Sequence, residues 1–441
     1  MEKNHKKTLW AWTMYDWANS VYPLVISSAI FPVYYTAVTT EKDAQGNIIN
    51  DTVQFLGMSF KNTVISNYVL SLSFLIIVLT SPLLSGIADS RGNKKRFLQF
   101  FCYMGALGAS SLYFLTKDPS TLPYGLLSIF IASLGFWSSL VFYNSYLPEI
   151  ADSETMDRLS ARGFAMGYIG SSTLLILCLI FIQGIAPKLN IPTGLATRYC
   201  FIAVGIWWIG FAQIFFSRIK SHTRKVSNPD ENSIFKGFHE LQKVWKQVKQ
   251  SSSLLIYLRS FWFFSMGVQT VMLVAAYFGA KFLNLPASKL LPVILIIQFV
   301  GIGGSFFFSW VSKKYGNKKS LSITLLAWIF ICIGAWFDAE YRSEGGFYVL
   351  AFFVGAVMGG VQSLSRSTYS KLIPENTVDT ASFFSFYDIT EKLAMVLGLF
   401  IFAYVEQHSP EKGMQNSVIA LIAFFIIGLI SLQKLNDKRL H

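Results

Sequence analysis

Apolar runs of about 20 residues recur along the chain with short polar turns between them. Each run is long enough to cross the roughly 30 Å hydrocarbon core of a bilayer as a helix. Six runs fall in the first half, at 10–35, 63–87, 97–115, 122–147, 160–183 and 198–217. Six more fall in the second half, at 254–283, 290–311, 321–338, 346–370, 381–405 and 414–433. The pattern predicts an all-α integral membrane protein with twelve transmembrane helices in two bundles of six.

A polar stretch joins the two sets and divides the chain into three parts. These are an N-terminal bundle at 1–217, a linker at 218–253 and a C-terminal bundle at 254–441. Apolar residues of the linker recur at three- and four-residue steps, namely Phe235, Phe238, Leu241, Trp245 and Val248. Lysines take the other faces, namely Lys236, Lys243, Lys246 and Lys249. This spacing predicts an amphipathic helix on the membrane surface, with anionic lipid as its partner.

Two short words occur once in each half. GNKK follows the second apolar run of the first half at 92–95 and the second run of the second half at 316–319. YNSYLPE at 143–149 closes the fourth run, and YSKLIPE at 369–375 closes the tenth. A repeated four-residue word is weak evidence alone, but equivalent positions in both halves indicate an internal repeat of six helices.

The composition and charge agree with a membrane protein. Hydrophobic residues make up 53% of the 441 residues and charged residues 14%, against roughly 25% charged in a soluble domain. Most of the 37 Lys and Arg residues lie in the termini and the even-numbered loops, so the positive-inside rule predicts cytoplasmic termini. The net charge of +13 is spread over these loops, with no compact basic domain for nucleic acid. We expect a monomer in the bacterial cytoplasmic membrane.

The sequence offers little to an enzyme or a cofactor. The four Cys residues have no paired spacing, and the words HExxH, Gly-x-Ser-x-Gly and Gly-Lys-Ser/Thr are missing from the chain. We therefore expect no catalytic residues, metal or cofactor. Without a nucleotide-binding motif, transport would run by ion coupling or facilitated diffusion, and the acids within the helices favour protons.

Ionisable residues within the apolar runs are candidate functional residues, because each costs at least about 2.5–3.5 kcal/mol at mid-membrane. Asp16 and Asn19 share a face of the first helix with Trp12, and Pro23 weakens the helix beyond them. Asp16 is predicted to bind a cation or proton and Asn19 the substrate. The alternative is that Asp16 is an acid near the membrane interface.

The eleventh run holds a pair of opposite charges. Asp388 and Lys392 are four residues apart and share a helix face, where each lowers the cost of burying the other. Such a pair can titrate as substrate or protons bind, or it can only fix helix packing. Both residues are predicted to bind substrate.

The six-plus-six plan with basic turns after helices 2 and 8 resembles the major facilitator superfamily of secondary transporters. The superfamily's loop motif Gly-x-Leu-Ala-Asp-Arg-x-Gly-Arg-Lys is matched in this chain by Ile87, Ala88, Asp89, Gly92 and Lys94. Ser85, Ser90 and Asn93 depart from it, and the second copy has Lys313 in place of the acid. The resemblance implies that Asp89 contacts the start of helix 11, near 379–382, and closes one face. A turn that only sets topology is the alternative.

Longer words indicate a branch of that superfamily. YDWANSVY at 15–22, FYNSYLPEIA at 142–151, SARGFAMGYIGS at 160–171 and GGVQSLSRSTYSKLIPE at 359–375 resemble the vacuolar amino-acid effluxer-like transporters. The resemblance implies efflux of amino acids, and it implies gating roles for Asp89, Gly92, Lys94 and Arg366.

Further polar residues lie on helices that line the central path in this superfamily. These are Tyr143, Asn144 and Gln362, with Gln269 on helix 7. Each is an expected substrate contact, although polar side chains also join helices to one another. An amino acid or short peptide would match the set, with its ammonium group on Asp16 or Asp388 and its carboxylate on Lys392 or Arg366. A lipid or lysolipid transporter and a non-transporting membrane sensor on the same fold are the other readings.

Overall fold

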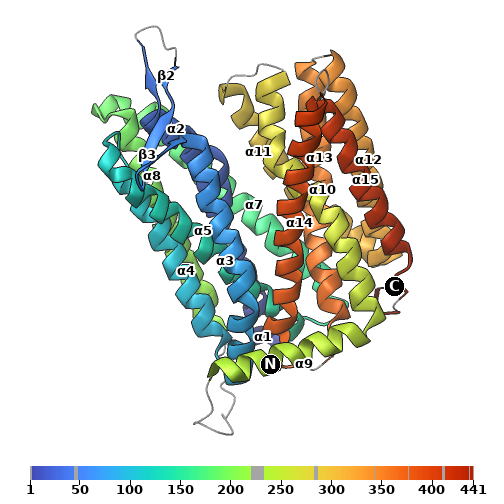
Figure 1. Cartoon of the computed structure of the whole chain (residues 1–441). Helices are drawn as coiled ribbons and strands as arrows, with labels where there is room; N and C mark the ends of the chain where they lie inside the picture. The colour runs from blue at the N-terminus through green and yellow to red at the C-terminus, as the bar shows by residue number, and fades with distance from the viewer. Residues whose placement is uncertain are drawn as a thin grey trace. The chain divides into compact units, whose positions relative to one another are not determined.

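The computed structural model describes residues 2–43, 48–219, 233–282, 287–341, 343–375, 377–409, 413–436 and 438–440. Within these ranges eleven helices are long and apolar enough to cross a membrane. A further helix of 29 residues, α14 (Thr380–His408), carries Asp388, Glu391 and Lys392 near its middle, which makes it less apolar. The predicted helical membrane fold is confirmed (Figure 1).

The chain divides into two compact units. Unit 1 comprises Met1–Ser81, Gly92–Tyr143 and Ile169–Thr223, and unit 2 comprises Pro82–Arg91, Asn144–Tyr168 and Arg224–His441. Unit 2 therefore includes the end of α3 (Asn62–Arg91), the end of α5 (Leu122–Ser145) and the start of α7 (Met156–Ile180), together with the helices of the second half. The division of the sequence into two repeated bundles and a linker stays a prediction.

Unit 1 is built from the helices of the first half. Its long elements are α1 (Glu2–Asn19), α2 (Phe31–Thr39), α3 (Asn62–Arg91) as far as Ser81, α4 (Lys94–Ser111), α5 (Leu122–Ser145) as far as Tyr143, α7 (Met156–Ile180) from Ile169, and α8 (Thr193–Arg218). Between α2 and α3 lie two short antiparallel hairpins, β1 (Glu41–Lys42) with β2 (Ile48–Asn50) and β3 (Thr52–Phe55) with β4 (Met58–Lys61). The pattern of apolar runs had not indicated these strands.

The first predicted helix changes geometry partway. A π-helix, η1 (Tyr22–Ile30), lies between α1 and α2, and Pro23 stands at its start. Proline lacks an N–H group, so the i to i−4 ladder cannot continue through it, and a π-helical segment takes up the difference. The weakening predicted at Pro23 is thus present, and it follows directly after Asp16 and Asn19.

Unit 2 contains the second set of long helices. They are α10 (Ser252–Phe282), α11 (Ala287–Tyr315), α12 (Asn317–Tyr341), α13 (Glu344–Leu372), α14 and α15 (Gly413–Gln433). The linker helix α9 (Ser233–Gln250) crosses the ends of α10 and α14 (Figure 1). The remaining linker residues, 220–232, lie outside the described residues.

Small residues set the closest helix packing of unit 2. A Cβ atom added to Gly304 of α11 would lie 2.0 Å from the carbonyl oxygen of Ala356 in α13. One added to Gly359 of α13 would lie 2.2 Å from the carbonyl oxygen of Gly301. The backbones of α11 and α13 therefore meet directly, which is the usual way helices associate in a membrane.

Candidate functional site

Each GNKK word forms the turn that follows a long helix, and the backbone of this turn explains why the word occurs twice. Gly92 has a φ of +63° and Gly316 a φ of +84°, in the left-handed region that glycine adopts without steric cost. Gly316 N–H donates to Ser312 O at 2.8 Å and closes the last turn of α11. The predicted tight turn at Gly92 is confirmed. Lys94 lies buried in the first turn of α4.

Asp89 accepts hydrogen bonds from the start of α14, as the resemblance to the superfamily's loop motif implied. Its Oδ2 accepts from Ser382 N–H at 2.7 Å, and its Oδ1 from Ala381 N–H at 3.3 Å. The first N–H groups of a helix have no partner within it and carry its positive dipole end, so a carboxylate is their favoured acceptor. Asp89 is 2% exposed, which protects these bonds from solvent.

The same helix end is held by two more side chains. Thr380 Oγ1 donates to Glu149 Oε1 at 2.6 Å, and Lys243 of α9 pairs with Asp379 at 2.7 Å. Trp245, also on α9, stacks on Phe386 with ring centroids 5.2 Å apart. We call Asp89, Glu149 and Lys243 with residues 379–382 the α14 latch. It joins segments of α3, α6 (Leu147–Ile150), α9 and α14 within unit 2.

Lys243 has a perturbed pKa. Its burial would lower the pKa of the ammonium group, but the neighbouring carboxylates of Asp379 and Glu240 outweigh this and hold it above its usual value. The side chain is still 48% exposed, so solvent screens the pair and the ion pair contributes modestly to stability.

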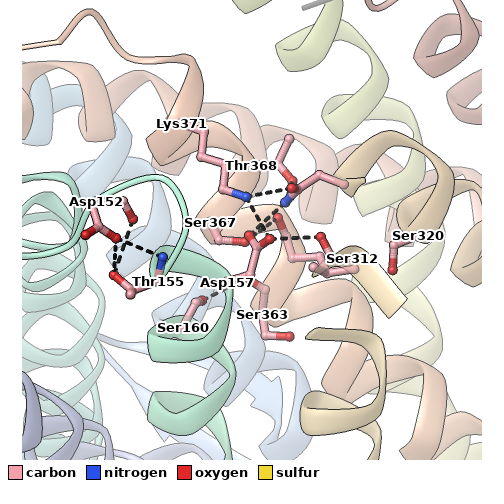
Figure 2. Close-up of polar contacts among 12 residues, drawn as sticks. Asp152, Thr155, Asp157, Ser160, Ser312, Ser320, Ser363, Ser367, Thr368 and Lys371 are labelled. Carbon is pink, nitrogen blue, oxygen red and sulfur yellow. Dashed lines mark hydrogen bonds and ion pairs between the residues drawn. The ribbon is translucent and has the colours of Figure 1, made fainter. Parts of the chain in front are cut away.

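A second buried network, missed in the sequence, lies in unit 2 around Asp157 (Figure 2). Lys371 Nζ lies 2.7 Å from Asp157 Oδ2, and both side chains are less than one-tenth exposed. Ser312 Oγ donates to the same oxygen at 2.8 Å, while Asn317 Nδ2 donates to Asp157 Oδ1 at 2.8 Å. Asn317 Oδ1 accepts from Lys371, and Asn317 Nδ2 also reaches Thr368 Oγ1.

This Asp157 network connects four helices, because Asp157 opens α7, Ser312 closes α11, Asn317 opens α12 and Lys371 closes α13. Two of its members stand in the repeated words, Asn317 in GNKK and Lys371 in YSKLIPE. That coincidence is the one sequence signal for the network.

Arg366 belongs to a third polar group, near which the predicted residues Asn144 and Gln362 also lie. Its Nε donates to Ser160 Oγ at 3.0 Å, its Nη2 to Ser160 O at 2.9 Å, and its Nη1 to Asn144 Oδ1 at 3.3 Å. The guanidinium lies 4.2 Å from the centre of the Phe164 ring. One turn away, Gln362 Oε1 accepts from Tyr168 Oη at 2.8 Å. Asn144 of α5 thus contacts α13, and Gln362 of α13 contacts α7, within unit 2.

Asp16 and Tyr143, both predicted, contact each other in unit 1. Tyr143 Oη donates to Asp16 Oδ2 at 2.8 Å, and the Tyr143 ring stacks on Trp12 with centroids 4.6 Å apart. Asp16 is 5% exposed and Asn19 1%. No described residue hydrogen-bonds to Asn19 Nδ2, although that atom is buried. These contacts bring α1 and α5 together around a buried carboxylate.

The predicted Asp388–Lys392 pair is present and has a third member. Lys392 Nζ lies 3.3 Å from Asp388 Oδ1 and 2.9 Å from Glu391 Oε2, with its side chain fully buried. Gln269 of α10 donates its Nε2–H to Glu391 Oε1 at 3.0 Å. Glu391 was missed although it stands in the word DITEK, where three charges within five residues of an apolar helix are the signal. We call Asp388, Glu391 and Lys392 the α14 charge cluster.

Comparison with known proteins shows the family of this chain. A family model described as vacuole effluxer Atg22 like matches residues 4–440. The chain belongs to this family. Among its relatives, an uncharacterized MFS-type transporter, YxiO, of Bacillus subtilis is 28% identical over 98% of this chain and 95% of its own. Autophagy-related protein 22-1 of Emericella nidulans is 22% identical over 92% of this chain and 86% of its own.

Solved structures confirm the fold. The proton:xylose symporter XylE, a major facilitator superfamily protein, matches with a TM-score of 0.72 at 12% identity, covering 99% of this chain and 96% of its own. The Escherichia coli fucose:proton symporter FucP matches with a TM-score of 0.69 at 10% identity, covering 98% of both chains. This Atg22-like protein therefore has the major facilitator superfamily fold. Its family and its relatives show that it is a transporter of that type.

Proposed function

We propose that this Atg22-like protein is a secondary active transporter that exports a small polar or zwitterionic solute, an amino acid or short peptide, by alternating access. The observation that carries the proposal is the fully buried Lys392 between two carboxylates in an apolar helix. Ionisable groups buried within membrane helices are costly and mark substrate or ion pathways. The family's description as a vacuole effluxer supports the direction.

A zwitterion suits the charges of these groups. Its carboxylate can take the place of Asp388 or Glu391 on Lys392, and its ammonium group can pair with the carboxylate that this frees. Asp16, held by the Tyr143 hydroxyl, is a second acceptor for an ammonium group or a proton. Charge-assisted bonds of this kind are roughly twice as strong as neutral ones, so they give both affinity and selectivity for charged solutes.

In this proposal the α14 latch and the Asp157 network are the contacts that break and form again when the protein changes conformation. Both join segments of the first half, at α3, α6 and α7, to helices of the second half through hydrogen bonds that can be broken and remade. We infer from the distribution of Lys and Arg that this end faces the cytoplasm, together with both termini. Alternating access then requires these contacts to open on one side during each cycle.

The linker helix α9 has a supporting role in the proposal. Val244 and Val248 are buried, while Phe238 is 53% exposed and the chain places Lys246 and Lys249 on exposed positions. Exposed apolar and basic side chains together suit the surface of an anionic membrane. We propose that α9 lies at that surface as part of a monomeric transporter.

A ligand screen on the purified protein tests the proposed solute class. A ligand that binds only the folded state raises the melting temperature, so pools of amino acids, dipeptides and lysolipids can be compared directly. We expect stabilisation by an amino acid or dipeptide pool, lost in Lys392→Met and Asp16→Asn. Asp338→Asn, a buried acid of α12 outside these groups, is the matched control and should respond like the wild type. Stabilisation by lysolipids alone would overturn the proposal in favour of a lipid transporter.

A further inference from the structure

The α14 charge cluster holds two acids for one base. Lys392 is the one ammonium group paired with both Asp388 and Glu391, and all three lie within five residues of α14. If all three are ionised, the cluster has a net charge of −1 within an apolar helix. Burying an uncompensated charge is expensive, so a proton or another cation is needed to neutralise the odd carboxylate.

The two carboxylates are not equally satisfied. Glu391 has a partner on each oxygen, Gln269 on Oε1 at 3.0 Å and Lys392 on Oε2 at 2.9 Å. Asp388 has only the longer contact from Oδ1 to Lys392, at 3.3 Å. Its Oδ2 is buried, and no residue in the described part of the chain donates a hydrogen bond to it. Asp388 is also the more buried of the two acids, with its side chain 7% exposed against 19% for Glu391.

The helices around the cluster bring few other charges. α15 has no titratable side chain between Gly413 and Gln433. From α10 come the Gln269 amide and the Tyr257 hydroxyl, which donates to Ser365 O at 2.8 Å. Tyr387 of α14 interacts electrostatically with Tyr257, with both acids and with Arg366 of α13. Arg366 is already bound by Ser160 and Asn144, and Lys243 of α9 by Asp379 and Glu240.

We propose that Asp388 is the site that binds the coupling proton, and that Glu391 keeps Lys392 from neutralising it. A proton from water bonds to Asp388 Oδ2, which makes that oxygen a donor and brings the cluster to neutrality. On release the proton returns to water, and the ammonium group of a solute can take over the odd negative charge. Proton and solute then compete for one carboxylate, which couples export of the solute to import of a proton. The coupling rests on the proposed function, whereas proton binding by Asp388 does not.

Infrared difference spectroscopy during a pH titration tests this without any solute. In protein labelled with carbon-13 aspartate, a buried Asp that gains a proton gives an isotope-shifted carbonyl band. We expect a component of this band in the wild type that is lost in Asp388→Asn. In Glu391→Gln, Lys392 belongs to Asp388 alone, so the band should appear only at lower pH. Asp338→Asn is the control, and in this variant the band that Glu391→Gln shifts should appear at the same pH as in the wild type.

Several outcomes would overturn the proposal. An aspartate band that survives Asp388→Asn unchanged puts the proton elsewhere. If Asp388→Asn does not fold, Glu391→Gln decides the question. An aspartate band that appears in Glu391→Gln at the same pH as in the wild type also puts the proton elsewhere. The titration is also run with sodium chloride replacing choline chloride. We expect no change, and a band displaced by sodium would make the cluster a metal-cation site. A failed solute screen with a normal titration would count against the transport proposal only.

Discussion

Lys371 at the end of α13 binds Asp157 at the start of α7 across 2.7 Å, and both side chains are buried. The two residues are 214 positions apart in the sequence and belong to different halves of the internal repeat. Ser312 and Asn317 add hydrogen bonds to the pair, so each charge has a neutral partner besides its counter-ion. An opening movement that separates α7 from α13 must break this pair.

Removing one partner of the pair should be more harmful than removing both. Lys371→Met leaves a buried carboxylate and Asp157→Asn a buried ammonium group, each a loss of about 3–5 kcal/mol for a buried pair. The double variant leaves no unpaired charge and should be more stable than the sum of the single losses predicts. Melting temperatures of the four proteins in detergent give this double-mutant cycle. Additive losses would show that the two side chains do not interact.

A gate differs from a packing contact in its effect on access. Ser363 is 1% exposed and lies two turns before Lys371 on α13, so a Ser363→Cys reporter is protected while the network is intact. We expect an impermeant maleimide to label this cysteine faster when Asp157→Asn is added, in vesicles that expose this end. Equal labelling rates would assign the network to stability alone.

Asp89→Asn should slow transport more than it weakens solute binding. The asparagine side chain has only one oxygen that can accept. Its NH₂ group would face the N–H group of Ala381 or Ser382, and two donors cannot bond to each other. Loss of a charged hydrogen bond of about 1.5 kcal/mol or more shifts the equilibrium between the latched and the open state roughly 10-fold toward the open state, so the return to the latched state in each transport cycle is impaired. Initial transport rates and thermal shifts by the solute separate the two effects. Asp152→Asn is the control, because Asp152 is an exposed acid whose Oδ1 accepts from nearby Thr155 and which lies outside the latch.

The Lys243–Asp379 pair should make stability depend on alkaline pH. The pKa of Lys243 is raised in the folded protein, so its contribution is fully present below the usual lysine pKa and is lost as pH rises through the raised value. Lys243→Met should therefore melt below the wild type at neutral pH and converge with it at high pH. Lys243→Arg keeps its charge in that range and should not converge. Parallel melting curves for Met and wild type at every pH would exclude the ion pair as the cause.

Gly304 and Gly303 of α11 form a matched pair for testing helix packing. A Cβ atom at Gly304 would lie 2.0 Å from Ala356 O, whereas one at Gly303 would have no atom within 4 Å. Gly304→Ala must push α11 from α13 and should lower the melting temperature clearly. Gly303→Ala should be neutral or gain up to about 1 kcal/mol from its higher helix propensity. The reverse order of stability would contradict the described contact.

The helices could be predicted because a bilayer requires long apolar runs, and eleven described helices satisfy that requirement. α14 was predicted as well, although its three charges weaken the signal. The Asp89 contact could be predicted because the loop motif carries it. The hairpins between α2 and α3 could not, since short strands outside the membrane leave no long pattern.

The sites were predicted only in part, for a different reason. Asp16 and Asp388 stood out because an acid in an apolar run is unusual. Glu391 was missed beside a pair already explained by helix spacing, while Asp157 and Lys371 lie at helix ends, where charges are common. Their pairing depends on tertiary structure, because partners far apart in sequence have no periodicity to connect them.

Proton flux in liposomes tests the central claim most directly. The wild type, Asp16→Asn, Lys392→Met and the control Asp338→Asn are reconstituted with a trapped pH dye, and amino acids and dipeptides are added in mixed pools. We predict a pool-dependent pH change in the wild type and Asp338→Asn, reduced roughly 10- to 100-fold in the other two by loss of a charged contact. A flux that is unchanged in both Asp16→Asn and Lys392→Met would contradict the assignment of these residues to transport.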